Sequence, residues 1–566
     1  MDVLNINQDT KIKDVLSLMV ENPENFGMAI IVDDNDQFLG VITLGDISRL
    51  LIKNSEILNE PLEIYFNKKP IYFYNPIKDE EVILKIKNET ISKKIPRYVP
   101  ILNKQRKVER LVDTYRCLSK SFIYPQKISI VGLGFVGITL ALALAGKNQY
   151  VIGYDNNKEI IKELNNGKSH VNEPGINSLI KKSLEEQKLI LSADPNMISA
   201  EVHIICVGTP VNSEKNPDIT FLLNALKDIS RILEKGNLVI IRSTVSIGTT
   251  RNEIIPKLEE YSGMKVGKDI FVSFSPERTV QGNALYEIEN LPQLVSGSSP
   301  DCLRKAIEFW RIVTNSVVQM DSLEACEIAK LANNAYRDLT FAFSNGISQI
   351  CANYQIDSSK LISSINEGYP RSFIPKPSPG VGGYCLTKDP YILSSSDACP
   401  IQFRNVLNNS REVNDLQIDF LKKHLDTFVE NKNLKFKDLE VLVIGLAFKG
   451  IPETNDIRNS TSIDLISKIK NQVKKIHGYD NALKSIDDNL GINFIKDINQ
   501  LKETVNNSSV VFVMNNNPSN IHEDFLSWLK KDSFLCDPWN MFTSFDVVNK
   551  YKVSYSNLGK LDLFGF

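Results

Sequence analysis

From about residue 125 onward, short runs of hydrophobic residues alternate with stretches whose hydrophobic positions recur at helical spacing. Such an alternation is typical of a parallel sheet that is covered by helices on both faces. The pattern therefore predicts an α/β fold with a doubly wound parallel sheet. The runs are KISIVGLG, QYVIGYD, KLILSAD, VHIICVGTP, NLVIIRSTV and IFVSFSP.

A long helical stretch from about Leu323 to Tyr354 then interrupts the alternation. A second alternating region begins at DLEVLVIGLAFKG and continues through KIHGYD, SVVFVMNN and SFLCDPW. We therefore predict two Rossmann-like domains joined by a long central helix. The expected boundaries are 125–320 for the first domain, 321–415 for a central helical region that also mediates dimerisation, and 416–566 for the second domain.

The N-terminal part of the chain, residues 1–122, contains two similar units of a different pattern. Each unit has an amphipathic helix pattern followed by short β-branched runs. The first unit reads KIKDVLSLMV, MAIIVDD and FLGVITLGDISRLLI, and the second reads EEVILKIKN, YVPILN and VERLVDTYRCLSK. We expect a pair of small α+β domains ahead of the two Rossmann-like domains.

The charge balance does not point to a polyanionic partner. The 566 residues include 66 Lys and Arg against 68 Asp and Glu, and neither half carries a long run of one sign. Binding to nucleic acid or to an anionic membrane is therefore not indicated. We expect a soluble protein of three or four domains with a small-molecule ligand.

Cysteine usage and the N-terminus bear on the compartment. The eight cysteines are scattered, with no CxxC pair and no His at metal-ligand spacing, which argues for a reducing cytosol and against a metal site. The N-terminus lacks the basic and apolar regions of a signal peptide, so we expect a cytoplasmic protein. Residues 128–146 are apolar enough to resemble a membrane span, but their regularly placed glycines favour another interpretation.

These glycines fit the dinucleotide-binding fingerprint G-x-G-x-x-G. Gly132, Gly134 and Gly137 come directly after a strand-like run and open a helical stretch. The turn would let a pyrophosphate approach the backbone amides at the helix start. Asp155, at the end of the next run, is placed to bond the adenosine ribose hydroxyls. Because a 2′-phosphate would be repelled there, we predict NAD in preference to NADP.

A second candidate site surrounds Cys385. Residues 380–393 read GVGGYCLTKDPYIL, with a glycine-rich turn before the thiol and Lys388 three residues after it. A thiol at such a turn would be accessible, and a nearby cation would favour the thiolate. Cysteine is otherwise usually a small buried hydrophobic residue, and this is our interpretation of the other seven.

Short motifs follow one another from residue 127 to the C-terminus: VGLGFVG, NEPGI, VGTP, STVSIGTT, SPER, EIAKLANNAYR, PGVGGYCLTKDP, SREVND, GLAFK, DIRNS and CDPWN. In these motifs and their order the chain resembles the nucleotide-sugar 6-dehydrogenase family. The resemblance implies a four-electron, NAD-dependent oxidation of the C6 alcohol of a UDP-sugar to the uronic acid. Cys385 would be the nucleophile, holding the aldehyde as a thiohemiacetal that becomes a thioester and is released by water.

The resemblance also implies roles for individual residues. Glu277 in SPER matches the family's acid/base glutamate, and Asp389 matches the aspartate that positions the attacking water. Lys330 and Asn334 share a helical face and match the groups that stabilise the oxyanion. The implied cofactor contacts are Gly132, Gly134, Phe135, Val136, Gly137, Asp155, Thr209, Ser243, Thr244, Val245, Lys388 and Arg458. The implied substrate contacts are Arg278, Arg371, Gly382, Phe448 and Lys449.

The motifs favour an N-acetylated sugar. SPER and the Pro-Arg pair ending at Arg371 resemble the branch that oxidises UDP-N-acetylhexosamines. We therefore predict UDP-N-acetylglucosamine or UDP-N-acetylmannosamine as substrate, for surface polysaccharide or glycan precursor synthesis, with Arg371 contacting it across a homodimer. Tyr384, where that branch has His, and Lys388, as in the UDP-glucose enzymes, leave UDP-glucose 6-dehydrogenase as the alternative. Gln281 replaces a carboxylate of the UDP-glucose group, so the contacts of its loop stay open.

In the N-terminal pair, the run GVITLGD ends a predicted strand with Thr43 and opens a helix with Asp46. This hydroxyl and carboxylate can meet the ribose and phosphate of a nucleotide, and the pattern resembles the CBS-domain signature. The second unit has Asp113 and Arg116 at the two positions and loses the pattern. One hypothesis is a CBS pair that binds an adenine nucleotide and regulates or assembles the enzyme. The alternatives are a dimerisation module in which Asp46 is only a helix cap, and an inactive scaffold that binds nucleotide sugar.

Overall fold

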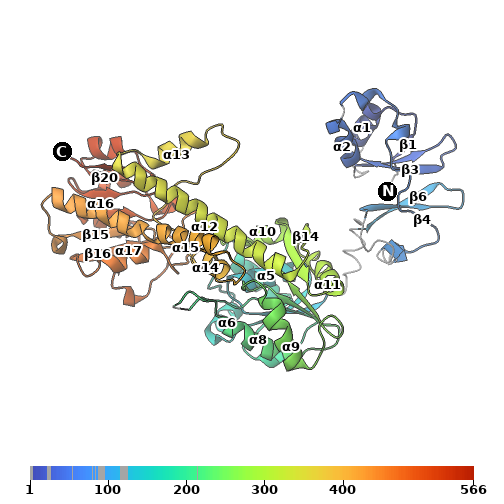
Figure 1. Ribbon diagram of the computed structural model, residues 1–566, viewed down its shortest axis with the longest axis horizontal. Coiled ribbons are helices and arrows are strands. Elements are labelled where there is room, and N and C mark those ends of the chain that lie inside the picture. The colour runs from blue at the N-terminus through green and yellow to red at the C-terminus, as the bar shows by residue number, and fades with distance from the viewer. Residues whose placement is uncertain are drawn as a thin grey trace. The chain divides into compact units, whose positions relative to one another are not determined.

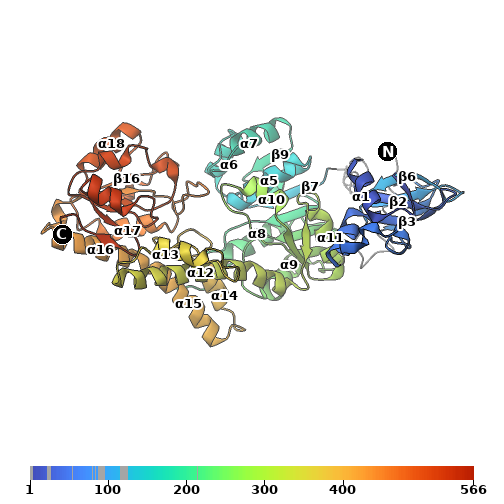
Figure 2. The ribbon, with the colours of Figure 1, turned by 90° about the horizontal axis from the view of Figure 1, so that it is seen from above.

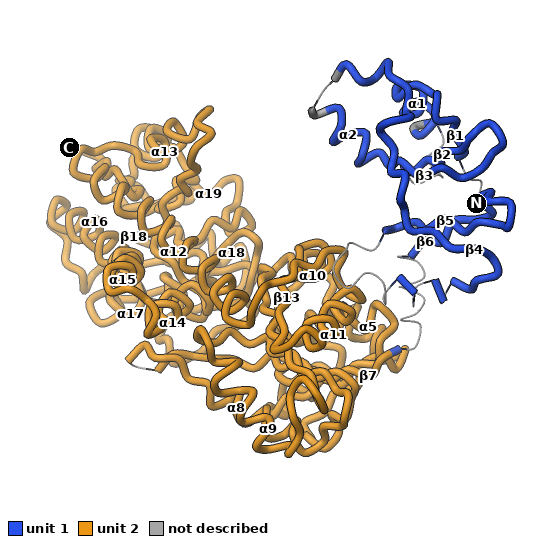
Figure 3. The backbone as a smooth tube through the Cα atoms, turned by 45° about the vertical axis from the view of Figure 1, so that its right-hand side comes forward, with its two compact units in different colours: residues 1–125 blue, residues 126–566 orange. Residues whose placement is uncertain are grey.

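The computed structural model describes residues 4–21, 27–53, 55–79, 81–82, 85–86, 96–114, 125–212 and 214–565 (Figure 1). The chain divides into two compact units, residues 1–125 and 126–566 (Figure 3). Each unit has its own hydrophobic core.

The first unit begins with a three-stranded sheet in the order β1-β2-β3, in which β1 and β2 are parallel and β2 and β3 antiparallel. Strand β2 is buried throughout, whereas β3 alternates buried and partly exposed residues, because only one of its faces lies on the core. The elements are β1 (Asn5–Asn7), α1 (Ile12–Glu21), β2 (Met28–Val32), β3 (Phe38–Thr43) and α2 (Leu44–Lys53).

The second half of this unit builds the same kind of sheet. Strand β4 pairs parallel with β5, which pairs antiparallel with β6. Met28 of β2 shares a hydrophobic core with Tyr98 and Leu102 of β5, so the two halves pack against each other. The helix predicted after β6, which includes Arg116, and part of the helix predicted over EEVILKIKN lie outside the described residues. The strands are β4 (Phe73–Tyr74), β5 (Tyr98–Leu102) and β6 (Val108–Asp113).

The second unit begins with an eight-stranded sheet in the order β14-β13-β12-β11-β10-β7-β8-β9. Strands β7 to β12 are parallel to one another, and β13 runs antiparallel to β12. The chain leaves β7 toward β8 on one side and returns to β10 on the other, which is the switch point of a doubly wound sheet. The predicted α/β fold is confirmed, and the six predicted runs are strands β7 to β12.

The strands of this sheet are β7 (Lys127–Val131), β8 (Tyr150–Tyr154), β9 (Leu189–Ser192), β10 (Val202–Ile205), β11 (Leu238–Ile241), β12 (Phe271–Phe274), β13 (Gln293–Gly297) and β14 (Val317–Gln319). Its helices are α5 (Phe135–Gly146), α6 (Lys158–Asn165), α7 (Ile176–Glu185), α8 (Thr220–Ser230), α9 (Ile255–Ser262), α10 (Ala284–Asn290) and α11 (Pro300–Trp310).

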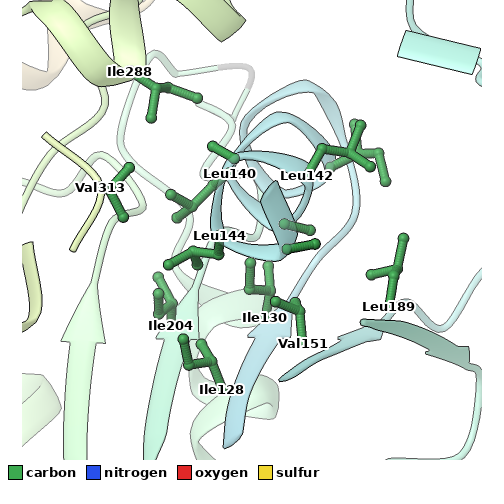
Figure 4. Close-up of a cluster of buried hydrophobic side chains, with 14 of the residues drawn as sticks. Ile128, Ile130, Leu140, Leu142, Leu144, Val151, Leu189, Ile204, Ile288 and Val313 are labelled. Carbon is green, nitrogen blue, oxygen red and sulfur yellow. The ribbon is translucent and has the colours of Figure 1, made fainter. Parts of the chain in front are cut away.

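The apolar segment 128–146 forms strand β7 and helix α5. Ile128 and Ile130 of the strand and Leu140 and Leu144 of the helix are fully buried in one cluster (Figure 4). Because α5 also packs against α7 and α10, it has no solvent-facing side that would require polar residues. Among the described residues, no helix is both long and apolar enough to cross a membrane.

Helix α12 (Leu323–Asn353) is the predicted central helix and runs between the two large sheets of the second unit (Figures 1 and 2). It begins after Ser322, whose hydroxyl accepts a hydrogen bond from the amide of Ala325 at 3.0 Å, a typical N-cap. It packs against α14 and α15. The other helices of the central region are α13 (Ser358–Asn366), α14 (Asp389–Ser394), α15 (Ile401–Asp415) and α16 (Gln417–Asn431).

The C-terminal sheet has seven strands in the order β17-β16-β15-β18-β19-β20-β21, parallel except for β21. The arrangement around β15 repeats that around β7, as expected for a second Rossmann-like domain. Helices α16 and α17 cover one face, and α18 and α19 the other. The elements are β15 (Glu440–Ile444), α17 (Thr461–Ile469), β16 (Lys475–Tyr479), β17 (Asn493–Phe494), α18 (Ile498–Asn507), β18 (Val510–Val513), α19 (Phe525–Trp528), β19 (Phe534–Cys536), β20 (Ser554–Ser556) and β21 (Leu561–Asp562).

Candidate active site

A cavity of about 630 Å³ lies where the first large sheet, α12, the loop before α14 and the C-terminal domain meet. Ligands of α/β proteins bind at this place, beyond the carboxyl ends of the strands and between domains. The cavity collects most of the residues predicted from the sequence. Those that line it are Gly132, Gly134, Phe135, Val136, Asp155, Thr209, Ser243, Thr244, Glu277, Arg278, Lys330, Asn334, Gly382, Cys385, Lys388, Phe448, Lys449 and Arg458.

The glycine-rich turn after β7 forms one end of the cavity. Gly132 has a φ of +92°, in the left-handed region that favours glycine. Gly137 lies behind the turn and does not line the cavity: a Cβ there would come within 1.8 Å of the carbonyl oxygen of Gly132. Because α5 begins directly after Gly134, the amides of its first turn have no intrahelical partners. The turn therefore fits a pyrophosphate.

The carboxylate of Asp155 holds the same turn. Its Oδ2 accepts a hydrogen bond from the amide of Leu133 at 2.8 Å, and its Oδ1 accepts one from the amide of Asn157 at 2.9 Å. Each carboxylate oxygen has a second lone pair, so Asp155 keeps acceptors for ribose hydroxyls at the edge of the cavity. The residues fit a dinucleotide whose 2′-hydroxyl is free.

Two hydrogen bonds connect the loop after β10 to the loop after β11 in the cavity wall. Thr209 Oγ1 donates to the carbonyl of Thr244 at 2.5 Å, and Ser243 Oγ donates to the carbonyl of Val207 at 2.7 Å. Val245, which the resemblance places at the cofactor, is instead buried in the hydrophobic core behind these loops and does not line the cavity.

The thiol of Cys385 opens into this cavity. Of the described cysteines it is the exposed one, whereas burial raises the pKa of the Cys326 thiol to about 12. The turn before it packs closely against the C-terminal domain: a Cβ on Gly383, which has a φ of +88°, would lie 2.7 Å from the ring of Phe448. The glycine-rich sequence is thus required by backbone conformation and by space.

Asp389 is completely buried beneath the Cys385 loop and does not line the cavity. Its Oδ2 accepts a hydrogen bond from Asn334 Nδ2 at 2.6 Å, and its Oδ1 accepts one from Lys388 Nζ at 2.7 Å. Burial opposes the charge of Lys388, but the carboxylate outweighs burial and raises the lysine's pKa. Asp389 therefore fixes the Asn334 amide and a charged Lys388 in the cavity wall.

Glu277 is buried in an ion pair with Arg242. Arg242 Nε donates to its Oε2 at 3.1 Å, and the amides of Arg278 and Thr279 donate to its Oε1 at 2.6 and 2.7 Å. Burial raises the pKa of Glu277, but Arg242 and the hydrogen bonds outweigh burial, so the pKa lies below its ordinary value. Arg242 was not predicted; a single arginine inside the hydrophobic run NLVIIRSTV was its only sequence indication.

Three further cations of the cavity come from the central helix and the C-terminal domain. Lys330 and Arg337 both lie on α12, and Lys449 comes from the C-terminal domain, where its Nζ donates to the carbonyl of Gln281 at 2.7 Å. Burial, together with the positive charge of Arg337, lowers the pKa of Lys449 to about 8. Arg337 was not predicted, although it stands in the motif EIAKLANNAYR.

Tyr384 lies between two cations of this wall. Its ring centroid is 5.3 Å from Lys388 Nζ and 5.0 Å from the guanidinium carbon of Arg458, which also pairs with Asp456 at 2.6 Å. Cations over an aromatic ring are attracted by the ring's quadrupole. Tyr384 therefore connects the Cys385 loop to the C-terminal domain.

Arg371 does not reach the cavity of its own chain. It is exposed between α13 and α14, with its guanidinium carbon 4.6 Å from the ring centroid of Tyr369 and its Nε 3.1 Å from the Tyr369 hydroxyl.

In the first unit, Thr43 and Asp46 bond to each other at the start of α2. Asp46 Oδ2 accepts hydrogen bonds from the amide and hydroxyl of Thr43 at 3.0 and 2.6 Å, and its Oδ1 pairs with Arg49 at 2.6 Å. Burial raises the pKa of Asp46, but these partners outweigh burial and leave the pKa lowered. The Thr43 hydroxyl in turn accepts a hydrogen bond from the Asp46 amide at 3.1 Å, so the two residues form a capping box with Thr43 as the N-cap. The carboxylate is left ionised.

The chain matches three domains of one protein family along its second unit. They are the NAD binding domain of the UDP-glucose/GDP-mannose dehydrogenase family over residues 126–314, its central domain over 324–416 and its UDP binding domain over 442–544. Residues 1–53 match the CBS domain.

Known relatives agree with these matches. The UDP-N-acetyl-D-mannosamine dehydrogenase of Pyrococcus horikoshii is 31% identical over 365 residues, covering 64% of this chain and 85% of the relative. The NDP-N-acetyl-D-galactosaminuronic acid dehydrogenase of Ralstonia solanacearum is 31% identical over 351 residues, covering 61% of this chain and 80% of the relative.

Solved structures give the same result. The UDP-D-ManNAc dehydrogenase from Pyrococcus horikoshii superimposes with a TM-score of 0.69 at 27% identity, covering 77% of this chain and all of that one. The UDP-N-acetyl-mannosamine dehydrogenase Cap5O from Staphylococcus aureus superimposes with a TM-score of 0.64 at 26% identity, covering 76% of this chain and 98% of that one. The chain belongs to the UDP-glucose/GDP-mannose dehydrogenase family; it is an NAD-dependent oxidoreductase with an N-terminal CBS domain.

Proposed function

We propose that this member of the family oxidises the C6 alcohol of a UDP-N-acetylhexosamine to the carboxylate through a covalent intermediate on Cys385. The observation that carries the proposal is that the exposed thiol shares one cavity with the dinucleotide turn and with Lys330 and Asn334. When bound, NAD accepts the hydride in each of the two oxidations.

The thiolate of Cys385 attacks the aldehyde carbon that the first oxidation produces, forming a thiohemiacetal. Lys330 and the Asn334 amide donate to the oxygen that becomes negatively charged. Asn334 is held for this task by Asp389, and removal of one such donor typically costs about 3 kcal/mol of transition-state stabilisation. The second oxidation turns the thiohemiacetal into a thioester.

Water then releases the acid, and Glu277 is the group that orients it and takes its proton. Because Arg242 lowers the pKa of Glu277, this carboxylate is ionised at neutral pH and can accept a proton. Asp389 acts as a positioning residue through Asn334 and Lys388, since these side chains already bond its two oxygens.

The cofactor is held by the turn at Gly132 and Gly134, by Asp155, and by Lys388 and Arg458 on the opposite wall. Thr209 and Ser243 line the wall between these two ends. The substrate is held by Arg278, Gly382, Phe448 and Lys449.

UDP-N-acetylmannosamine and UDP-N-acetylglucosamine are the favoured substrates. Supporting them are the SPER motif and relatives whose names specify N-acetylated sugars. UDP-glucose is the alternative. Mixing the protein with NAD and a panel of UDP-sugars and following NADH absorbance tests the proposal: we expect two NADH per sugar consumed with an N-acetylated substrate, and no NADH with any member of the panel would refute it.

We further propose that the enzyme is a homodimer joined through α12. Tyr336, Phe343 and Ile350 are 68%, 56% and 57% exposed and recur every seven residues along this helix, which is the spacing of a helix-packing seam. Arg371 would then contact the substrate of the partner subunit. The CBS domain would bind an adenine nucleotide at Thr43 and Asp46 and regulate the enzyme.

A further inference from the structure

One face of α12 carries a row of buried polar side chains, and the proposed chemistry uses only the first part of the row. Lys330 and Asn334 line the active-site cavity, and Asp338 and Asn345 continue the same face at intervals of four and seven residues. Asp338 and Asn345 are completely buried and do not line the cavity. Buried polar groups need hydrogen-bond partners. The partners of these two residues come from α15 and from the loop that leads to Cys385.

Asn345 joins α12 to both of these elements. Its Oδ1 accepts a hydrogen bond from the amide of Ser378 at 2.9 Å, and its Nδ2 donates to Asn414 Oδ1 at 2.9 Å. Ser378 Oγ donates in turn to the carbonyl of Gly380 at 2.8 Å. The first residues of the loop are therefore bonded directly to the central helix.

Arg411 of α15 holds the next part of the loop. Its Nη2 donates to the carbonyl of Val381 at 3.3 Å, four residues before Cys385, and its Nη1 donates to Asp338 Oδ1 at 2.5 Å. The side chains of this ion pair are each 1% exposed. Burial opposes the charge of Arg411, but Asp338 and Asp415 outweigh burial and raise the pKa of the arginine. A charged guanidinium that is bound to α12 thus fixes a backbone carbonyl of the loop.

The loop also lies directly on the backbone of α15. Gly380 has a φ of +101°, in the left-handed region that favours glycine, and a Cβ there would lie 2.8 Å from the carbonyl oxygen of Asn414. Asn414 Nδ2 donates to Asp338 Oδ1 at 2.9 Å, which ties this turn of α15 to α12. A side chain at position 380 would push the loop away from α15.

The other end of the loop is bonded to the same face of α12. Asp389, four residues after Cys385, accepts a hydrogen bond from Asn334 Nδ2 at 2.6 Å. The amide of Asp389 donates to the carbonyl of Cys385 at 2.9 Å. Cys385 therefore lies between two attachments to one helix. Because Lys330 and Asn334 belong to the same face of that helix, the thiol and the proposed oxyanion donors are held relative to one another.

We propose that Arg411 is a positioning residue for Cys385, and that Asp338 holds Arg411 in place for this role. The proposal rests on the proposed function in taking Cys385 as the nucleophile. The thiol has to meet the aldehyde before the aldehyde leaves the cavity, and misplacement of a reacting group by about 1 Å can cost about 100-fold in rate. The motif SREVND, which contains Arg411, thereby acts in the capture of the aldehyde.

Product analysis of Arg411→Lys with NAD and a UDP-sugar tests the proposal. Lysine keeps the charge but lacks the fork that bonds Asp338 and Val381 at once. We expect kcat to fall about 10- to 100-fold. The yield of NADH per sugar should fall from two toward one, because aldehyde escapes before the thiol captures it, and a hydrazine reagent traps the released aldehyde for measurement. KM for NAD should not change, since Arg411 does not line the active-site cavity.

A double variant removes the ion pair without leaving a buried charge. Asp338→Leu combined with Arg411→Met replaces both side chains by apolar ones, an exchange that often leaves stability unchanged or higher. This variant should lose aldehyde capture in the same way, with little change in thermal unfolding. Gln417→Leu is the matched control: Gln417 is also completely buried and donates to Ser348 of α12 at 3.3 Å, but within the described residues it has no hydrogen bond to the loop.

Hydrogen exchange of the full-length protein without ligands, measured by mass spectrometry, does not depend on turnover. Amides of residues 378–385 should exchange about tenfold faster in Arg411→Lys and in the double variant than in wild type and Gln417→Leu. Two NADH per sugar and unchanged exchange in both variants would overturn the role of Arg411. Faster exchange in both variants, together with a wild type that oxidises no sugar, would refute only the proposed function.

Discussion

Arg242 holds the carboxylate of Glu277 in an ion pair that is almost completely removed from solvent, with side-chain exposures of 1% and 10%. A buried carboxylate without such a partner has a raised pKa and is protonated at neutral pH. The guanidinium of Arg242 also lies over the ring of Trp310, 4.7 Å from its centroid. The hydrophobic core of the first large sheet therefore positions the arginine that determines the charge of a candidate catalytic residue.

Arg242→Gln should move the acid limb of the pH–rate profile upward, because burial would then raise the pKa of Glu277 without compensation. Removing one partner of a buried pair should also cost about 3–5 kcal/mol of stability. In wild type, Glu277 has a lower pKa in the folded state than in the unfolded state, so its ionisation stabilises the fold at pH values above the unfolded-state pKa. This stabilisation is lost as the pH falls through the folded-state pKa of Glu277. Steady-state rates and thermal unfolding between pH 4 and 9 measure both effects; an unshifted acid limb would contradict the role of Arg242.

Cys385→Ala should abolish NADH production, by at least about 10³-fold, because no other group can hold the aldehyde between the two oxidations. The hydrogen bonds that hold the dinucleotide turn come from Asp155 and do not involve this side chain, so NAD binding should persist. Cys399→Ser is a matched control, since Cys399 does not line the cavity. Near-normal acid production by Cys385→Ala would eliminate the covalent mechanism.

The apparent affinity for the nucleotide sugar should fall as pH rises above about 8, because Lys449 then loses its charge. Lys449→Arg, which stays charged, should give a flatter dependence of KM on pH between 7 and 10. The same lowered pKa means that the unfolded state binds more protons between pH 8 and the lysine's ordinary value near 10.5, so this group makes stability rise with pH in that range. Identical KM profiles for both proteins would exclude Lys449 as the titrating group.

Asp46→Ala should weaken binding of AMP, ADP or ATP to the CBS domain and should also lower the stability of the first unit by about 1 kcal/mol, because a helix cap is lost. Asp46→Asn separates the two effects, since its amide oxygen can still accept the hydrogen bond from the Thr43 amide while the charge is lost. Calorimetry with the three nucleotides measures binding. The same heats for wild type and Asp46→Ala would leave Asp46 as a structural cap.

Phe343→Glu should dissociate the proposed dimer, because it places a charge in the middle of the exposed seam of α12. Sedimentation velocity measures the oligomeric state of the wild-type protein and of the variant. Phe545→Glu is the control: Phe545 is 75% exposed but lies outside this seam. If the wild-type protein sediments as a monomer, both the proposed dimer and the proposed contact of Arg371 with the partner's substrate are contradicted.

Much of the fold could be predicted because it depends on local patterns. The strands β7 to β12 and the helix α12 follow from hydrophobic runs and helical spacing over short windows. Asp155 could be predicted as well, because the turn and the next strand are close in sequence. The burial of the Val245 side chain could not be predicted, for the opposite reason. The motif STV does not reveal which of its side chains faces the core, and only the packing behind the loop decides it.

By itself, the sequence determined the two doubly wound domains, the dinucleotide turn and the unusual setting of Cys385, because each is encoded in a few consecutive residues. Only the tertiary structure revealed that Arg242 holds Glu277, 35 residues away, and that Lys449 reaches the carbonyl of Gln281, 168 residues away. Such pairs leave no periodic pattern along the chain. The charge of a buried group depends on the partners that folding brings beside it. Arg242 and Glu277 meet when the first domain folds, and Lys449 meets Gln281 only when both domains are assembled.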